Sequence, residues 1–94
     1  MYSLLVGIDV SKDFFATAGI DSEGKESFSR SCSMDSDGFG DFLKTVTSHC
    51  EDLSKVIVAM ESTGCYHINL FSFLTSHGVR TMVVNPLLIA NFQK

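Results

Sequence analysis

The sequence lacks tryptophan, has one proline among 94 residues, and contains three cysteines, Cys32, Cys50 and Cys65. Three is an odd number, and no two of these cysteines have the Cys-x-x-Cys spacing. Both observations argue against a disulfide framework and against a zinc knuckle. We therefore expect three reduced and mostly buried thiols.

Long apolar runs are also missing. No segment approaches the ~18 apolar residues that a membrane-spanning helix needs. No basic region precedes the short apolar run at residues 4–6, as it would in a signal peptide. These absences predict a cytoplasmic protein that has no membrane partner.

Positive charge is in short supply. Seven lysines and arginines stand against eleven acidic residues, so the formal net charge is −4. A domain that binds nucleic-acid phosphates by itself is normally basic, so any such surface must lie elsewhere in a longer parent chain.

The composition is that of a globular domain, because 45% of residues are hydrophobic and 19% are charged. Eight phenylalanines predict a phenylalanine-rich core.

The hydrophobic pattern predicts three strands followed by alternating helices and strands. The first three strands are expected at residues 3–10, 14–20 and 26–33, with a turn at 11–13 and a hairpin turn at 21–24. Short connections between these strands predict an antiparallel meander. Beyond them, helices are expected at 35–53, at 64–77 and from Leu87 onward, and strands at 55–60 and 79–84.

Helical spacing and end signals support these helices. Ser36 or Asp37 is expected to cap the start of the first helix. Gly78 is expected to end the second helix in a left-handed conformation, and Asn85-Pro86 to begin the third. The faces expected to pack consist of Phe39, Phe42, Leu43, Val46, Cys50 and Leu53 in the first helix and of Tyr66, Leu70, Phe73 and Leu74 in the second.

The order of the elements predicts the topology of the sheet. A strand–helix–strand crossover within one sheet is right-handed and makes its two strands parallel. The strand at 55–60 should therefore lie beside the first strand, on the side away from the meander. The expected fold is α/β and RNase H-like (RuvC-like), a mixed five-stranded sheet in the order 3-2-1-4-5. Its first three strands are antiparallel, and helices cover its faces.

Two carboxylates fall at the ends of strands that should be parallel neighbours. Asp9 lies near the end of the first strand, and Glu61 lies just past the end of the fourth. Ligand sites of open α/β sheets form at the carboxyl ends of strands. Two carboxylates there repel each other unless a cation lies between them, and hard ions such as Mg²⁺ take oxygen ligands. Asp9 and Glu61 are therefore the candidate catalytic residues and metal ligands, in a site suited to metal-assisted phosphoryl transfer.

Three motifs in this order resemble one family closely. They are VGIDVSKD at residues 6–13, MESTG at 60–64, and VVNP at 83–86. Together they resemble the DEDD-type insertion-sequence transposases, which include the Piv DNA invertase. That family has a RuvC-like N-terminal catalytic domain with four metal-binding acids, of which Asp9 matches the first and Glu61 the second. The other two acids belong to a later K-T-D-x-x-D-A segment, which does not occur in residues 1–94.

The resemblance implies a DNA transposase or site-specific recombinase that cleaves and joins DNA strands with Mg²⁺ or Mn²⁺. Residues 1–94 would then be the N-terminal part of the catalytic domain and inactive alone. DNA would be a partner of the full-length protein, which is expected to form a homo-oligomer. Some members are guided by a structured RNA, so a guide RNA is also a candidate partner.

Other interpretations remain open from the residues themselves. The chain could be a fragment of an actin-like or sugar-kinase ATPase, although the turn at 11–13 has no glycine to cradle phosphates. It could also belong to a RuvC-like resolvase or nuclease, or to a non-catalytic assembly module. Lys12 is either a phosphate contact or a solvated turn residue, and His67 either approaches the site or is an ordinary histidine. Ile68 and Phe71 belong either to an interface or to the core.

Overall fold

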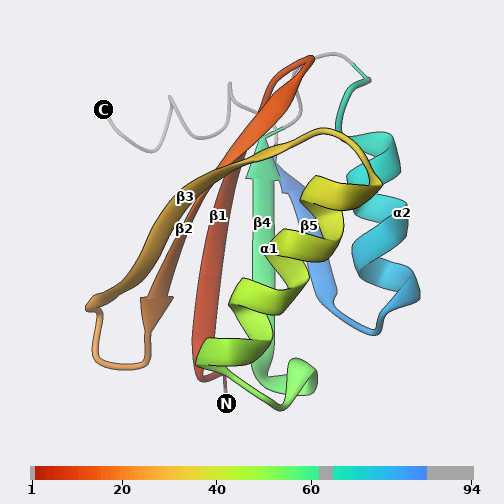
Figure 1. Ribbon diagram of the computed structural model, residues 1–94. Coiled ribbons are helices and arrows are strands. Elements are labelled where there is room, and N and C mark those ends of the chain that lie inside the picture. The colour runs from red at the N-terminus through yellow and green to blue at the C-terminus, as the bar shows by residue number, and fades with distance from the viewer. Residues whose placement is uncertain (1, 62–64, 85–94) are drawn as a thin grey trace.

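The computed structural model describes residues 2–61 and 65–84, which form one five-stranded sheet and two α-helices (Figure 1). The predicted helix from Leu87 onward and the Ser62-Thr63-Gly64 turn lie outside the described residues. The elements are β1 Leu4–Val10, β2 Phe14–Asp21, β3 Glu26–Ser33, α1 Ser36–His49, the 3₁₀ turn η1 Leu53–Lys55, β4 Val56–Glu61, α2 Ile68–Ser76 and β5 Arg80–Val84.

The strand order is β3-β2-β1-β4-β5, which confirms the predicted topology. β1 pairs antiparallel with β2 and β2 with β3, while β1 pairs parallel with β4 and β4 with β5. The fold is therefore the predicted mixed α/β, RNase H-like arrangement. In the described part of the chain, α1 and α2 lie on the same face of this sheet (Figure 1).

Strict alternation along β1 and β4 separates the two faces of the sheet. Leu4, Val6, Ile8 and Val10 are buried, whereas the residues between them are exposed. The buried residues pack against α1 and α2 because successive side chains of a strand point to opposite faces. Phe15 is fully buried, and its ring meets that of Phe42 edge-on at a centroid distance of 5.6 Å. The core is therefore rich in phenylalanine, as predicted.

The ends of α1 differ from the prediction. Asp35, rather than Ser36 or Asp37, is the N-cap: its carboxylate accepts a hydrogen bond from the Gly38 backbone N–H at 2.8 Å. That bond, with a second from the Ser33 hydroxyl, lowers the pKa of Asp35. The helix ends at His49 rather than at residue 53, because the backbone of Cys50 is extended.

The second helix also begins later than predicted, at Ile68. Leu70 and Leu74 are buried and face the sheet, as expected, but Tyr66 precedes the helix and is 47% exposed. Ile68 is exposed as well, whereas Phe71 packs against the core. Past the end of the helix, Gly78 has φ 79°, the left-handed conformation predicted for it.

The cysteines are free, as predicted, but only one of the three is buried. Burial raises the pKa of the Cys32 thiol, so this group stays protonated near neutral pH. Cys50 is half-buried and Cys65 is exposed, so the expectation of mostly buried thiols was wrong. In the described residues, neither helix is long and apolar enough to cross a membrane.

Two glycines of α1 provide a matched test of how closely this helix packs against the end of β3. A Cβ at Gly38 would collide with the backbone carbonyl of Ser33, whereas a Cβ at Gly40 would meet nothing within 4 Å. We expect Gly38→Ala to destabilise the chain by about 1–3 kcal/mol through overpacking. Gly40→Ala should stabilise it by about 0.5–1 kcal/mol, because alanine loses less backbone entropy in a helix. Urea denaturation of both variants measures the difference, and equal effects would contradict the close contact between α1 and β3.

Candidate functional site

Asp9 and Glu61 lie at the same edge of the sheet. The parallel pairing of β1 with β4 runs from Leu4 opposite Val56 to Ile8 opposite Met60. Asp9 and Glu61 are the next residues on their strands. Glu61 is the last residue of β4 rather than just past it, a small correction to the predicted boundary. Two neighbouring parallel strands thus present a carboxylate each at their carboxyl ends.

Both acids line one open hollow of about 500 Å³. It lies on the sheet face opposite the two described helices, because Ile8 and Met60, the residues before the acids, are buried on the helix side. Asp9 is exposed and Glu61 is half-buried. The rest of the lining comes from all five strands and is formed by Gly7, Ile8, Ala16, Thr17, Ala18, Ser29, Ala59, Met60 and Val84.

The middle of this hollow is built from small residues. Gly7 pairs with Ala18 on one side and with Ala59 on the other, and Ala18 pairs with Ser29. A Cβ on Gly7 would meet nothing within 4 Å, so the packing of the described residues does not require glycine there. A glycine inside a strand often marks a place where a ligand or another backbone approaches closely. The sheet beside the two acids is therefore open to close approach.

No lysine or arginine in residues 2–61 and 65–84 neutralises the two acids. The salt bridge of this part of the chain joins Arg30 to Asp41 at 2.7 Å, on the helix side of the sheet. Two carboxylates in one hollow repel each other, and a cation between them removes that repulsion. Their oxygens are the donors that Mg²⁺ and Mn²⁺ prefer. The donor set therefore fits a hard divalent ion.

The described residues supply only part of such a site. They contain no group of three or more His, Cys, Asp or Glu side chains placed to hold a metal ion. Mg²⁺ prefers six ligands in octahedral geometry. Asp9 and Glu61 would thus need further ligands from water, substrate or other residues.

Lys12 and His67, the other two candidate residues, are not among the residues that line the hollow. Lys12 and Asp13 are exposed in the turn between β1 and β2. His67 is half-buried, and its Nδ1 has no hydrogen-bond partner in the described part of the chain. The sequence interpretation missed Phe14, which is 53% exposed at the start of β2. The strand alternation of Phe14 and Phe15 was the signal, since only one of two successive side chains can face the core.

Solved structures share the fold at low sequence identity. A Bacteroides thetaiotaomicron protein of unknown function with an actin-like ATPase fold has a TM-score of 0.66 and 15% identity, over 87% of this chain and 32% of its own. Pelota from Archaeoglobus fulgidus has a TM-score of 0.55 and 19% identity, over 89% and 26%. YeaZ from Pseudomonas aeruginosa has a TM-score of 0.51 and 15% identity, over 88% and 43%.

In each case this chain spans less than half of the solved chain, and the likeness shows the fold alone. No curated protein matches the sequence. A family model described as a transposase, of the IS110 DEDD type, matches residues 6–94. This match includes all three motifs and both strand-end acids. The chain therefore belongs to the IS110-type DEDD transposase family.

Proposed function

We propose that residues 1–94 are the N-terminal part of the metal-dependent catalytic domain of a DNA transposase. One observation carries the proposal: Asp9 and Glu61 stand at the ends of adjacent parallel strands and line the same hollow. The motifs that contain them give Asp9 the place of the first family acid and Glu61 that of the second.

In this proposal Asp9 and Glu61 hold Mg²⁺ or Mn²⁺ through their carboxylate oxygens. The ion, when bound, stabilises negative charge on a phosphate of the DNA during strand cleavage and joining. Asp9 supplies one oxygen donor from β1, the central strand of the sheet. Glu61 supplies the second oxygen donor from the neighbouring strand, and the small residues around Gly7 leave room beside it.

The partners follow from charge and from the incomplete ligand set. A chain with net charge −4 is poorly suited to hold DNA by itself, so DNA binding belongs to the full-length transposase. The third and fourth acids would come from sequence beyond Lys94, and residues 1–94 alone would be inactive. We further propose that the full-length protein works as a homo-oligomer, with a structured guide RNA as a candidate partner.

Binding of Mn²⁺ tests the two ligands directly. We expect the 94-residue chain to bind Mn²⁺ weakly, and Asp9→Asn and Glu61→Gln each to weaken binding by about tenfold or more, because each removes one anionic donor. Electron paramagnetic resonance of free Mn²⁺ measures the binding. Glu26→Gln is the matched control, since Glu26 is an exposed acid at the start of β3. The two ligands would be wrongly assigned if Glu26→Gln weakened binding as much as they do.

The other interpretations predict different ligands. An actin-like ATPase would bind ATP through a turn rich in small residues, but the turn between β1 and β2 consists of Ser11, Lys12 and Asp13. A RuvC-like resolvase or nuclease would use the same two acids on DNA without joining strands. A non-catalytic assembly module would tolerate neutral residues at positions 9 and 61 without loss of function.

A further inference from the structure

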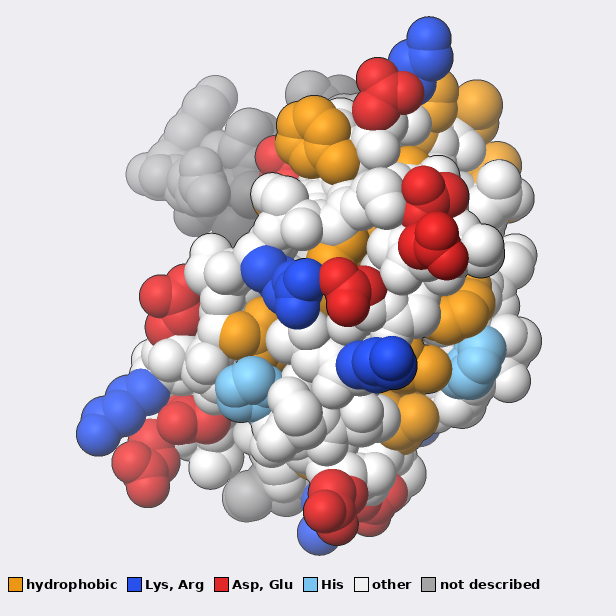
Figure 2. Space-filling view, in the orientation of Figure 1, with side chains coloured by type: hydrophobic (Ala, Val, Ile, Leu, Met, Phe, Trp, Pro, Cys, Tyr) orange, Lys and Arg blue, Asp and Glu red, His pale blue; other side chains and the backbone are white. Residues whose placement is uncertain are grey.

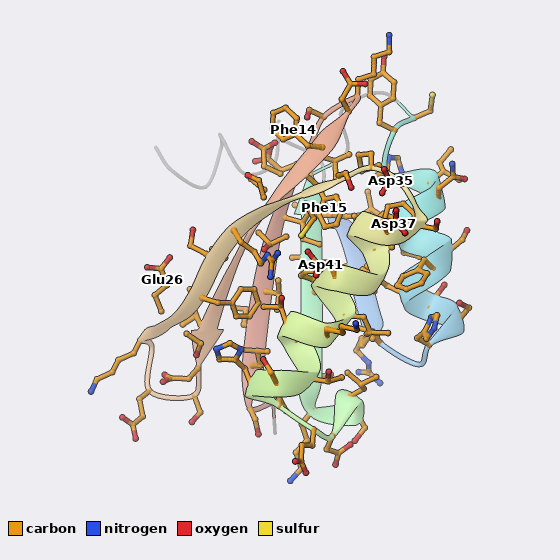
Figure 3. The ribbon with its side chains drawn as sticks, in the orientation of Figure 1. Phe14, Phe15, Glu26, Asp35, Asp37 and Asp41 are labelled. Carbon is orange, nitrogen blue, oxygen red and sulfur yellow. The ribbon has the colours of Figure 1, made fainter. Side chains whose placement is uncertain are left out.

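Phe14 differs from the other described phenylalanines. Phe15, Phe39 and Phe42 belong to the buried core, and Phe28, Phe71 and Phe73 pack against it. Phe14 does neither, and 53% of its surface is exposed. Figure 3 shows Phe15 between the sheet and α1, whereas Phe14 lies at one end of the sheet, away from both helices. An exposed aromatic ring is available to a partner, and its position indicates which partner.

The register places Phe14 on the same sheet face as the candidate metal ligand Asp9. Asp9 pairs with Ala16, and Phe14 is two residues before Ala16 on β2. Residues two apart on a strand share a face, so Phe14 lies on the same sheet face as Ala16 and Asp9. It lies one step further along β2, past the carboxyl end of β1. Diagonal neighbours of this kind are separated by about 7–8 Å, within reach of a substrate held at the carboxylates.

Hydrogen bonds and strand pairing anchor the backbone that carries the Phe14 ring. The Phe14 carbonyl accepts two hydrogen bonds from Ser11, one from the backbone N–H at 3.0 Å and one from the hydroxyl at 2.7 Å. Phe14 also pairs with Ser33 on β3. A ring on an anchored strand end loses little conformational freedom when a planar partner stacks on it.

The local charge also favours an aromatic contact. A lysine or arginine beside Asp9 and Glu61 would compete with a metal ion for the carboxylates. An aromatic ring binds a nucleobase through its face without adding charge, and such stacking tolerates any base sequence. The helix-covered face, which Figure 2 shows, has acidic and basic side chains interspersed. It has no continuous positive patch among the described residues.

We propose that Phe14 is a substrate-positioning residue that stacks on an unpaired base of the DNA strand held at Asp9 and Glu61. The inference rests on the proposed function, because it takes the two acids as the place where the strand is cut. It adds that the bases next to the cut are unstacked from the duplex and that one of them lies on the Phe14 ring.

The test uses the full-length transposase and a fluorescein-labelled oligothymidine, whose unpaired bases can stack freely. Phe14→Leu should weaken binding about tenfold or more, as expected for loss of one stacked base, whereas Phe14→Tyr should bind like the wild type. Fluorescence anisotropy gives the dissociation constants. Ile20→Ala is the matched control, because Ile20 is 39% exposed on the same face of β2 at its other end and should not affect binding.

The outcomes separate stacking from packing and from the metal site. If Phe14→Leu binds DNA as tightly as the wild type, an apolar contact or no contact replaces stacking, and the inference is overturned. The inference is also overturned if Phe14→Tyr binds DNA as weakly as Phe14→Leu. Melting curves of both variants show that the proteins are folded. DNA cleavage by Asp9→Asn is measured in parallel. If Asp9→Asn loses cleavage while Phe14→Leu binds DNA normally, only the role of Phe14 is wrong. Unchanged cleavage in Asp9→Asn would instead remove the proposed function.

Discussion

Replacing Asp9 with asparagine in the full-length transposase is expected to lower the rate of DNA strand cleavage by about a thousandfold or more. Asparagine has nearly the same shape and keeps one oxygen, but it removes the negative charge that would hold the ion. Losing a stabilisation of several kcal/mol in the transition state corresponds to a rate loss of this size. Because Asp9 is exposed on a sheet face whose neighbours are small, the substitution should leave folding intact.

The measurement is single-turnover cleavage of a DNA substrate in Mg²⁺ and again in Mn²⁺. Glu61→Gln should behave like Asp9→Asn, and Glu26→Gln should cleave at the wild-type rate. Glu26 carries the same charge on the same sheet, but Figure 3 shows it at the opposite end from Phe14. Cleavage within a few-fold of the wild type in Asp9→Asn would mean that the carboxylate holds no catalytic ion, and the proposed function would be wrong.

Sheet topology followed from the sequence because two simple constraints fix it. Short connections between the first three strands leave antiparallel pairing as the available arrangement, and a helical crossover makes the fourth strand parallel to the first. Both constraints act through the backbone, so they do not depend on the detailed packing of side chains. The predicted start of β3 at Glu26 is confirmed, because Asp21 and Gly24 form the hairpin turn before it.

Helix ends and exposure were harder to predict because they depend on local competition. Asp35, Ser36 and Asp37 are all residues that cap helices, and the sequence does not show which of them can reach the Gly38 N–H. In the structure, the carboxylate of Asp35 accepts hydrogen bonds from the Gly38 backbone N–H at 2.8 Å and from the Ser33 hydroxyl at 2.7 Å. Tyr66 matched the helical spacing of the buried face, but α2 begins after it, so the ring has no helical position from which to face the sheet.

The sequence predicted where the two acids of the candidate site lie, but it did not predict what surrounds them. Strand ends can be read from a pattern, so Asp9 and Glu61 could be placed at one edge. The hollow beside them depends on the alignment of Gly7 with Ala18 and Ala59, which is a property of strand register. Register across three strands requires the structure. Alternation predicts that one of Phe14 and Phe15 is exposed, but only the structure shows that it is Phe14.

The largest effect on folding is expected from Phe42→Ala. Phe42 is fully buried in α1, and its ring contacts Phe15 of β2, so it joins the helix layer to the sheet. Removing a buried phenylalanine ring costs about 3–5 kcal/mol, because the apolar surface is lost and a cavity remains. A domain of this size is stable by about 5–15 kcal/mol, so the loss is a large share of the total.

Phe14→Ala is the matched control for this substitution, because it makes the same chemical change at a ring that lies outside the core. It should cost under about 1 kcal/mol, as expected for an exposed strand position. Urea denaturation of the 94-residue chain, followed by far-ultraviolet circular dichroism, measures both variants. If Phe42→Ala and Phe14→Ala destabilised the chain equally, the two rings would have equal burial. Phe14 would then be buried rather than exposed, and the inference that it is free to stack on DNA would fail.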